Sequence, residues 1–399
     1  MYKNCFAGSV ESSVPRTFLS LMDRTLTLDK LAVELLTLIS FFACTDGGQT
    51  GCSLALVSKR INYASRPARF YSVQLLDSPT QIEKFLQSYQ QQQARATDNI
   101  PRVRHLCLSF FGKGLETAPT DATPMPAPRS RAEWLASLQK RAQHMQSGQE
   151  SLDEQYNRVI PALIRTVAPD LHSLALMQAQ WRSSTVLRCQ FPYLEEMTLV
   201  GGDPTFLPFD FLPSDKPIYP ALKRLHHIQS LVNKDVDFFK WAKHAPELTH
   251  LRVSRLDYHP RGTVDTLIQS IGTSAPEDVF PHLEKVVIQP NPGPPLGTRQ
   301  GTAELSYRDF LSHLRRSITK ARVPVLLLPP MELPKVAPGV DPSRGCIMKL
   351  RSVWQSAIEG KQYTWETSVA EPQLPPARLM PSGFVTPSHM AKGMVAVGA

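Results

Sequence analysis

The sequence lacks the motifs that would mark a metalloprotein, a disulfide-bonded secreted protein or a common enzyme. Its six cysteines form no C-x-x-C pair, and no histidine pair lies near them at metal-ligand spacing. We therefore expect reduced thiols and no structural zinc. The signatures G-x-x-x-x-G-K-[S/T], H-E-x-x-H and G-x-S-x-G are also absent. The sequence predicts a protein that is not an enzyme and binds no cofactor.

Long apolar runs are also missing. The most apolar stretch, residues 28–44, contains Asp29, Lys30 and Glu34 and is too short to span a bilayer. The N-terminus has no charged region followed by a long apolar one, so it does not have the form of a secretory signal. With the cysteine pattern, this favours a cytoplasmic and/or nuclear protein without a membrane contact.

Acidic residues are in deficit, with 35 Asp+Glu against 44 Lys+Arg and a net charge of +9. An excess of positive charge can indicate a nucleic-acid partner. The strongest excess, residues 299–351, has ten basic and four acidic residues spread over a predicted helix and proline-rich loops. No run is dense enough to form a basic stripe, so nucleic acid is not an expected partner.

The N-terminal region has the pattern of two apolar helices. Residues 28–42 place apolar side chains at helical spacing: Leu28, Leu31, Leu35, Leu38, Ile39 and Phe42. A Gly- and Ser-rich turn follows at 45–53, then a second amphipathic helix at 53–65 and a short strand at 69–76. About fifty residues do not easily cover such apolar helices, so we expect a partner surface.

This region resembles the F-box, especially the F-box-like modules of fungal proteins. The motif Leu-Pro-x-Glu-Leu-Leu-x-x-Ile is matched at Leu31, Glu34, Leu35, Leu36 and Ile39, and a second part is matched at 56–59. Ala32 stands in the place of the proline, and the frequent tryptophan after the second helix is absent. The resemblance implies a Skp-type adaptor and a cullin complex as partners. It implies an adaptor site formed by Leu31, Glu34, Leu35, Leu36, Ile39 and Val57, with the apolar residues divided between the core of the module and the adaptor face. The alternative is a helical cap on the domain that follows.

Six later segments share one shape. Each has a proline followed by apolar residues in a Leu-x-x-Leu-x-Leu pattern, with prolines at 101, 169, 192, 220, 246 and 281. Three of the five spacings fall within about 20–29 residues, and the pattern resembles degenerate leucine-rich repeats. We expect stacked parallel strands with inward residues Leu108, Leu176, Leu199, Val253 and Ile288. The fourth repeat has His227 at this position, so we expect that repeat to be irregular or shifted in register. A mixed sheet with proline-initiated strands is the alternative. Residues 323–330 predict a further strand, and 347–360 a helix that caps the stack.

The alternate residues of these strands would form a concave surface for a target protein. Its predicted contacts are Met177, Thr198, His226, Arg252, Ser254 and Gln289. His226 and His227 are adjacent on one strand, so their rings should point to opposite faces, which argues against a metal pair.

The predicted fold class is α/β: a small N-terminal all-α F-box-like module followed by an irregular leucine-rich-repeat-like solenoid. The expected divisions are a flexible segment at 1–24, the module at 25–75, the repeat domain at 76–365 with a proline-rich insertion near 114–130, and a disordered tail at 366–399. The expected function is that of a substrate-receptor subunit of a cullin-RING ubiquitin ligase. The alternative is a repeat-based interaction scaffold unconnected to ubiquitination.

Overall fold

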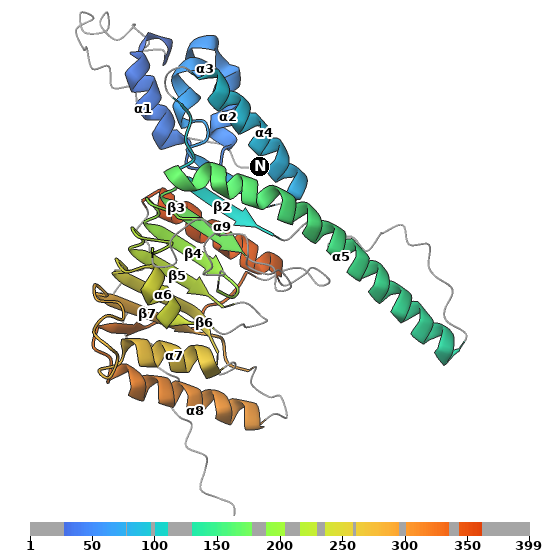
Figure 1. Ribbon diagram of the computed structural model, residues 1–399, viewed down its shortest axis with the longest axis vertical. Coiled ribbons are helices and arrows are strands. Elements are labelled where there is room, and N and C mark those ends of the chain that lie inside the picture. The colour runs from blue at the N-terminus through green and yellow to red at the C-terminus, as the bar shows by residue number, and fades with distance from the viewer. Residues whose placement is uncertain are drawn as a thin grey trace, which may run out of the picture.

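A single parallel sheet organises the chain. The computed structural model describes residues 28–76, 78–96, 100–110, 130–177, 189–203, 216–229, 236–257, 261–294, 301–334 and 343–360. Within these residues eight strands hydrogen-bond side by side, each parallel to its neighbours, and their spatial order is their order along the chain (Figure 1). They are β1 (Ser72–Leu75), β2 (His105–Ser109), β3 (Ser173–Met177), β4 (Glu196–Val200), β5 (Arg224–Ile228), β6 (His250–Leu256), β7 (Lys285–Pro290) and β8 (Val325–Leu327).

The positions and register of the strands agree with the sequence pattern. Every segment predicted as a strand contains one, and the predicted inward residues lie in one paired row with His227: Leu108, Leu176, Leu199, His227, Val253 and Ile288. Each is fully buried. The fourth repeat is therefore neither irregular nor shifted in register, and that expectation is wrong. The pattern was decisive because a register shift of one residue would turn every apolar side chain to the other face.

Helices cover both faces of the sheet. On one face, α4 (Pro79–Arg95), α5 (Arg131–Val167), α6 (Phe238–His244), α7 (Arg261–Ile271) and α8 (Gly301–Ile318) contribute to the main core. This core includes the inward strand row. On the other face, α9 (Ser343–Ile358) packs on a second apolar cluster. The N-terminal half of α5 extends far beyond the sheet (Figure 1).

Three short helices precede β1. They are α1 (Val33–Ala43), α2 (Gln49–Val57) and α3 (Lys59–Ser65). The single helix predicted at 53–65 is wrong, because Ser58 has an extended backbone and its Oγ accepts from Ile61 N, which caps a new helix. Gly51 lets α2 lie close to the backbone at Arg69, because a Cβ at position 51 would be 2.5 Å from the Arg69 carbonyl oxygen.

The predicted fold class is wrong in its division into a separate all-α module and a solenoid. Strand β1 lies within the predicted module and pairs with β2, so the N-terminal helices lead directly into the edge of the one sheet. Bonds from Ser72 Oγ to the Cys44 carbonyl (2.7 Å) and from Gln74 N to the Gly47 carbonyl (3.2 Å) join the helices to β1. The structure is an α/β arrangement around one eight-stranded parallel sheet with helices on both faces.

The predicted position of the last helix is also wrong. We expected residues 347–360 to cap one end of the stack, but α9 lies on the face of β2, β3 and β4. An amphipathic helix can bury its apolar side against an edge or a face, and the sequence does not distinguish the two. The predicted flexible N-terminus (1–24) and disordered tail (366–399) lie outside the described residues, as does the insertion near 114–130 except for Ser130.

Candidate functional site

Helix α1 exposes an apolar face. Leu35, Leu38, Ile39 and Phe42 lie at i, i+3, i+4 and i+7, which places them on one side of the helix, and all four are exposed. Phe42 is 76% exposed. The opposite side of α1 is held by Leu36 and by Thr37 Oγ1, which donates to the Ala64 carbonyl at 2.9 Å. We call the four exposed residues the α1 face.

Additional exposed apolar side chains lie near the α1 face in the sequence. Among the described residues, half of the sixteen exposed large hydrophobic side chains fall between residues 28 and 63: Leu28, Leu35, Leu38, Ile39, Phe42, Leu56, Val57 and Tyr63. Single exposed apolar residues are ordinary, but a concentration of them is typical of an interaction surface. The α1 face is therefore the strongest candidate for a protein-docking site.

The predicted adaptor residues divide between surface and interior. Leu35, Ile39 and Val57 are exposed, as is Glu34, and Leu31 is half-buried. Leu36 is buried, so its assignment to the adaptor surface is corrected: it belongs to the interior of the helical region. Leu38 and Phe42 were not assigned to the site, although the i, i+3, i+4, i+7 stripe contained both.

The predicted target surface is covered. Met177, Thr198, His226, Arg252 and Ser254 are all buried, and Gln289 is half-buried. Met177 lies in the apolar cluster under α9 with Leu350 and Trp354. The strand register predicted these residues to share one face, and they do. However, they do not form an open concave surface.

The polar residues of this predicted surface hydrogen-bond to one another. Ser254 Oγ lies 2.8 Å from His226 Nε2 and accepts from Arg252 Nε at 3.3 Å. Gln289 Oε1 accepts from Arg252 Nη2 at 2.9 Å and from Ser254 Oγ at 3.1 Å. The cluster thus links β5, β6 and β7 through side chains. Such buried hydrogen bonds fix the relative positions of the strands.

His226 and His227 face opposite sides of the sheet, as predicted. His227 is fully buried on the main-core side, and its Nε2 lies 3.8 Å from Asp203 Oδ1. Neither of its ring nitrogens has a hydrogen-bond partner among the residues that the structure describes. Burial lowers the pKa of His227 to about 3. Burial also raises the pKa of Asp203 to about 6, although Asp203 accepts from Asp237 N and Trp241 Nε1.

The His227→Leu variant should be more stable than the parent by about 1–3 kcal/mol, because it replaces a buried polar ring without hydrogen bonds. Leucine also matches Leu108, Leu176 and Leu199 in the same row. Asp203 keeps its two hydrogen bonds. The His226→Leu variant is the matched control: it removes the bond to Ser254 and should lower stability by a similar amount. Urea unfolding at pH 7 measures both, and a lower midpoint for His227→Leu would contradict the prediction.

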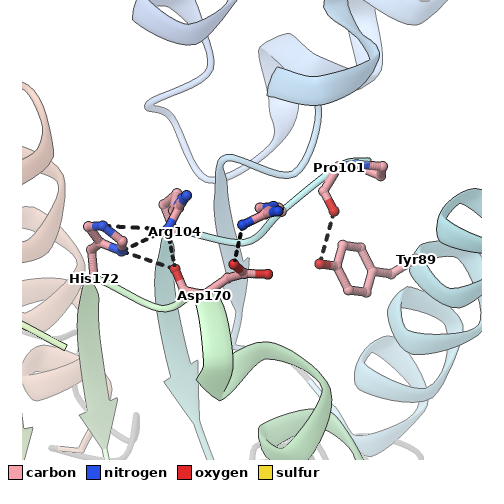
Figure 2. Close-up of polar contacts among 6 residues, drawn as sticks. Tyr89, Pro101, Arg104, Asp170 and His172 are labelled. Carbon is pink, nitrogen blue, oxygen red and sulfur yellow. Dashed lines mark hydrogen bonds and ion pairs between the residues drawn. The ribbon is translucent and has the colours of Figure 1, made fainter. Parts of the chain in front are cut away.

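A second polar cluster lies where the chain enters β2 and β3. Arg102 Nη1 pairs with Asp170 Oδ1 at 2.9 Å, and Arg104 Nη1 lies 3.1 Å from the Asp170 carbonyl oxygen and 3.2 Å from His172 Nδ1. Figure 2 shows these side chains beside Tyr89, whose hydroxyl donates to the Pro101 carbonyl at 3.1 Å. Arg102 and Asp170 lie 68 residues apart in the sequence, so their ion pair joins the segments that lead into β2 and β3. The bond from Tyr89 joins α4 to the same segment before β2. These bonds connect separate elements of the fold, so we assign the cluster a structural role.

The described residues hold no group of three or more His, Cys, Asp or Glu side chains that could bind a metal ion. In the same part of the chain, no helix combines the length and apolar character needed to cross a membrane. Comparisons of the chain with protein-family models, with curated proteins and with solved structures found no match.

Proposed function

We propose that this protein is a substrate-receptor subunit of a cullin-RING ubiquitin ligase, in which the α1 face binds a Skp-type adaptor. The observation that carries the proposal is the outward-facing apolar stripe Leu35, Leu38, Ile39 and Phe42. This stripe includes two of the residues that resemble the F-box motif. In this role the protein performs no bond chemistry: it holds a target near the transferring enzyme and so raises the target's effective concentration.

The backbone at the motif's missing proline supports the resemblance. Ala32, which stands in the place of that proline, has φ −58° and precedes the first turn of α1. The proline ring holds φ near −65°. The local conformation is therefore the one that the motif's proline would adopt, so the substitution changes the side chain without requiring a different entry into the helix.

Adaptor binding tests the proposal. The intact protein should bind a purified Skp-type adaptor, and the Leu35→Asp/Ile39→Asp double variant should bind at least about 100-fold more weakly. Burying each of these side chains contributes roughly 1.5–3 kcal/mol, and a carboxylate there must be desolvated as well. Titration followed by calorimetry or biolayer interferometry measures the change.

The matched control is Leu305→Asp, the same substitution at an exposed leucine of α8. It should leave adaptor affinity unchanged. Absence of adaptor binding by the intact protein, or equal binding by the double variant, would remove the proposal.

An interaction scaffold outside any ligase is the second candidate. The bonds that join α1–α3 to β1 favour it, among them Ser72 Oγ to the Cys44 carbonyl and Gly47 N to Ser72 Oγ at 3.0 Å. In that case the three helices cover the β1 edge of the sheet, and the protein binds no Skp-type adaptor.

A further inference from the structure

Helix α9 occupies a seat on the sheet that is chemically distinct from the main core. It lies across β2, β3 and β4 (Figure 1). Cys346, Leu350 and Trp354, spaced four residues apart, face the sheet together. On the sheet they meet five apolar side chains, which we call the α9 seat: Cys107, Ala175, Met177, Val200 and Ile228.

The α9 seat and the main core form separate apolar clusters. The main core lies on the other face of the sheet and is built with residues of α4, α5, α6, α7 and α8, and no residue of α9 belongs to it. The sheet separates the two clusters because neighbouring residues along each strand point to opposite faces. Release of α9 would therefore expose the seat while leaving the main core closed.

Cationic groups border the seat at its β6 side. Arg255 is only 7% exposed, yet its guanidinium donates to Asn291 Oδ1 at 3.3 and 3.4 Å and to Cys346 Sγ at 3.7 Å. No carboxylate of the described residues lies within ion-pair distance of it. Arg252 is buried nearby on the same strand.

The backbone at Arg255 is strained. Its φ is +59°, which is uncommon for a residue with a side chain, and the β6–β7 pairing shifts register between Ser254 and Leu256. A bulge of this kind redirects a side chain, and strain of this kind is concentrated at functional positions. Here the result is a buried guanidinium directed at the first turns of α9.

Helix α9 is poorly matched to these cations. Its sequence, SRGCIMKLRSVWQSAI, contains three basic residues and no acidic one. Lys349 is half-buried. The pKa of His226 is lowered first by burial and then by the charge of Arg252, and the nearby charge of Lys349 lowers it further. The helix N-terminus also carries partial positive charge. The basic first half of α9 therefore lies beside the buried Arg255 guanidinium of β6, which is 3.7 Å from Cys346 Sγ.

We propose that α9 occupies, within the same chain, a docking site for an amphipathic helix of a partner protein. The partner helix would carry apolar side chains at i, i+4 and i+8, as α9 does, and an acidic side chain where α9 carries Lys349. Apolar anchors on one helix side are the usual mode of helix-in-groove recognition. The acid would complement the buried Arg255 guanidinium. This inference concerns the target-binding role within the proposed function. It rests on the proposed function only in identifying the partner as a ubiquitination target.

Three labelled peptides of residues 343–358 test the proposal: the parent sequence, Lys349→Glu and Arg351→Glu. The last two have the same charge, but Arg351 is exposed and is the matched control. Each is titrated against the intact chain and against its Leu350→Ala/Trp354→Ala variant, which weakens the hold of α9. Fluorescence anisotropy measures binding, and circular dichroism with urea unfolding monitors the fold.

The intact chain should bind the parent peptide weakly or not at all, because its own α9 is present at high effective concentration. The double variant should remain cooperatively folded and bind all three peptides. The Lys349→Glu peptide should bind at least about tenfold more tightly than the parent, and the Arg351→Glu peptide within about threefold of it.

Three results would overturn the proposal: loss of the cooperative fold in the double variant, a folded variant that binds no peptide, or equal affinities for the two glutamate peptides. In the last case the seat serves α9 alone. The outcome is independent of the adaptor experiment, since Leu350 and Trp354 do not belong to the α1 face. The double variant should bind the adaptor as the parent chain does if the proposed function holds.

Discussion

Trp241→Ala should lower the free energy of unfolding by about 3–5 kcal/mol, the usual range for loss of a buried tryptophan. Trp241 is fully buried and stacks on Tyr219 with ring centroids 5.5 Å apart, and Tyr219 stacks on Phe191 at the same distance. Removal of the indole creates a cavity at one end of this aromatic row. It also removes the Nε1–H that donates to Asp203 at 2.7 Å.

Trp241→Phe separates the two losses. Phenylalanine keeps a ring against Tyr219 but donates no hydrogen bond, so the variant should lose about half as much stability as the alanine variant. Phe239→Ala, in the same short helix at a partly exposed site, should change stability by less than about 1 kcal/mol. Urea unfolding measures all three, and a Trp241→Ala effect no larger than that of Phe239→Ala would show that the aromatic row does not support the core.

Acidification should destabilise the fold between pH 7 and pH 5. Burial lowers the pKa of His105 to about 4 and that of His227 to about 3, and it places the pKa of His226 well below its usual value. Between pH 6.5 and pH 4 the unfolded chain therefore binds protons at these rings that the folded chain does not bind. Stability is then lost as the pH falls through this window.

Asp203 has the opposite effect on stability. Its pKa is raised to about 6 in the folded chain from the ordinary value of 3.8, so as the pH falls the folded chain binds this proton before the unfolded chain does. Protonation of Asp203 therefore stabilises the fold at low pH, and this contribution is lost as the pH rises through 6. Each group contributes up to about 1.4 kcal/mol per pH unit. Three histidines against one carboxyl leave a net loss of about 2–3 kcal/mol per unit between pH 6 and pH 5.

Urea midpoints at pH 7, 6 and 5 measure this loss. The His227→Leu variant provides an internal control, because the slope should decrease by about 1.4 kcal/mol per pH unit when one of the three rings is removed. A midpoint that does not change from pH 7 to pH 5 would indicate that these histidines are protonated in the folded chain, against their burial.

The sequence by itself determined the strands and their register. Leu174 and Leu176, with their equivalents in the other repeats, alternate with residues of the opposite face, and parallel pairing of such strands buries them in one row. Helical spacing likewise predicted the apolar stripe of α1, whereas the resemblance to the F-box assigned its Leu35 and Ile39 to a docking surface. These features were predictable because side-chain direction in a strand or a helix follows from spacing alone.

Only the tertiary structure decided which apolar and polar surfaces remain open. Leu35 and Leu36 are neighbours with the same chemistry, and the packing of α1 on α3 buries one and exposes the other. Asp203 meets His227 across 24 positions of sequence. Met177 of the predicted target surface is covered by α9, a helix more than 160 residues away in the chain. Spacing shows which side of an element is apolar, whereas the choice of what covers it depends on contacts between distant segments.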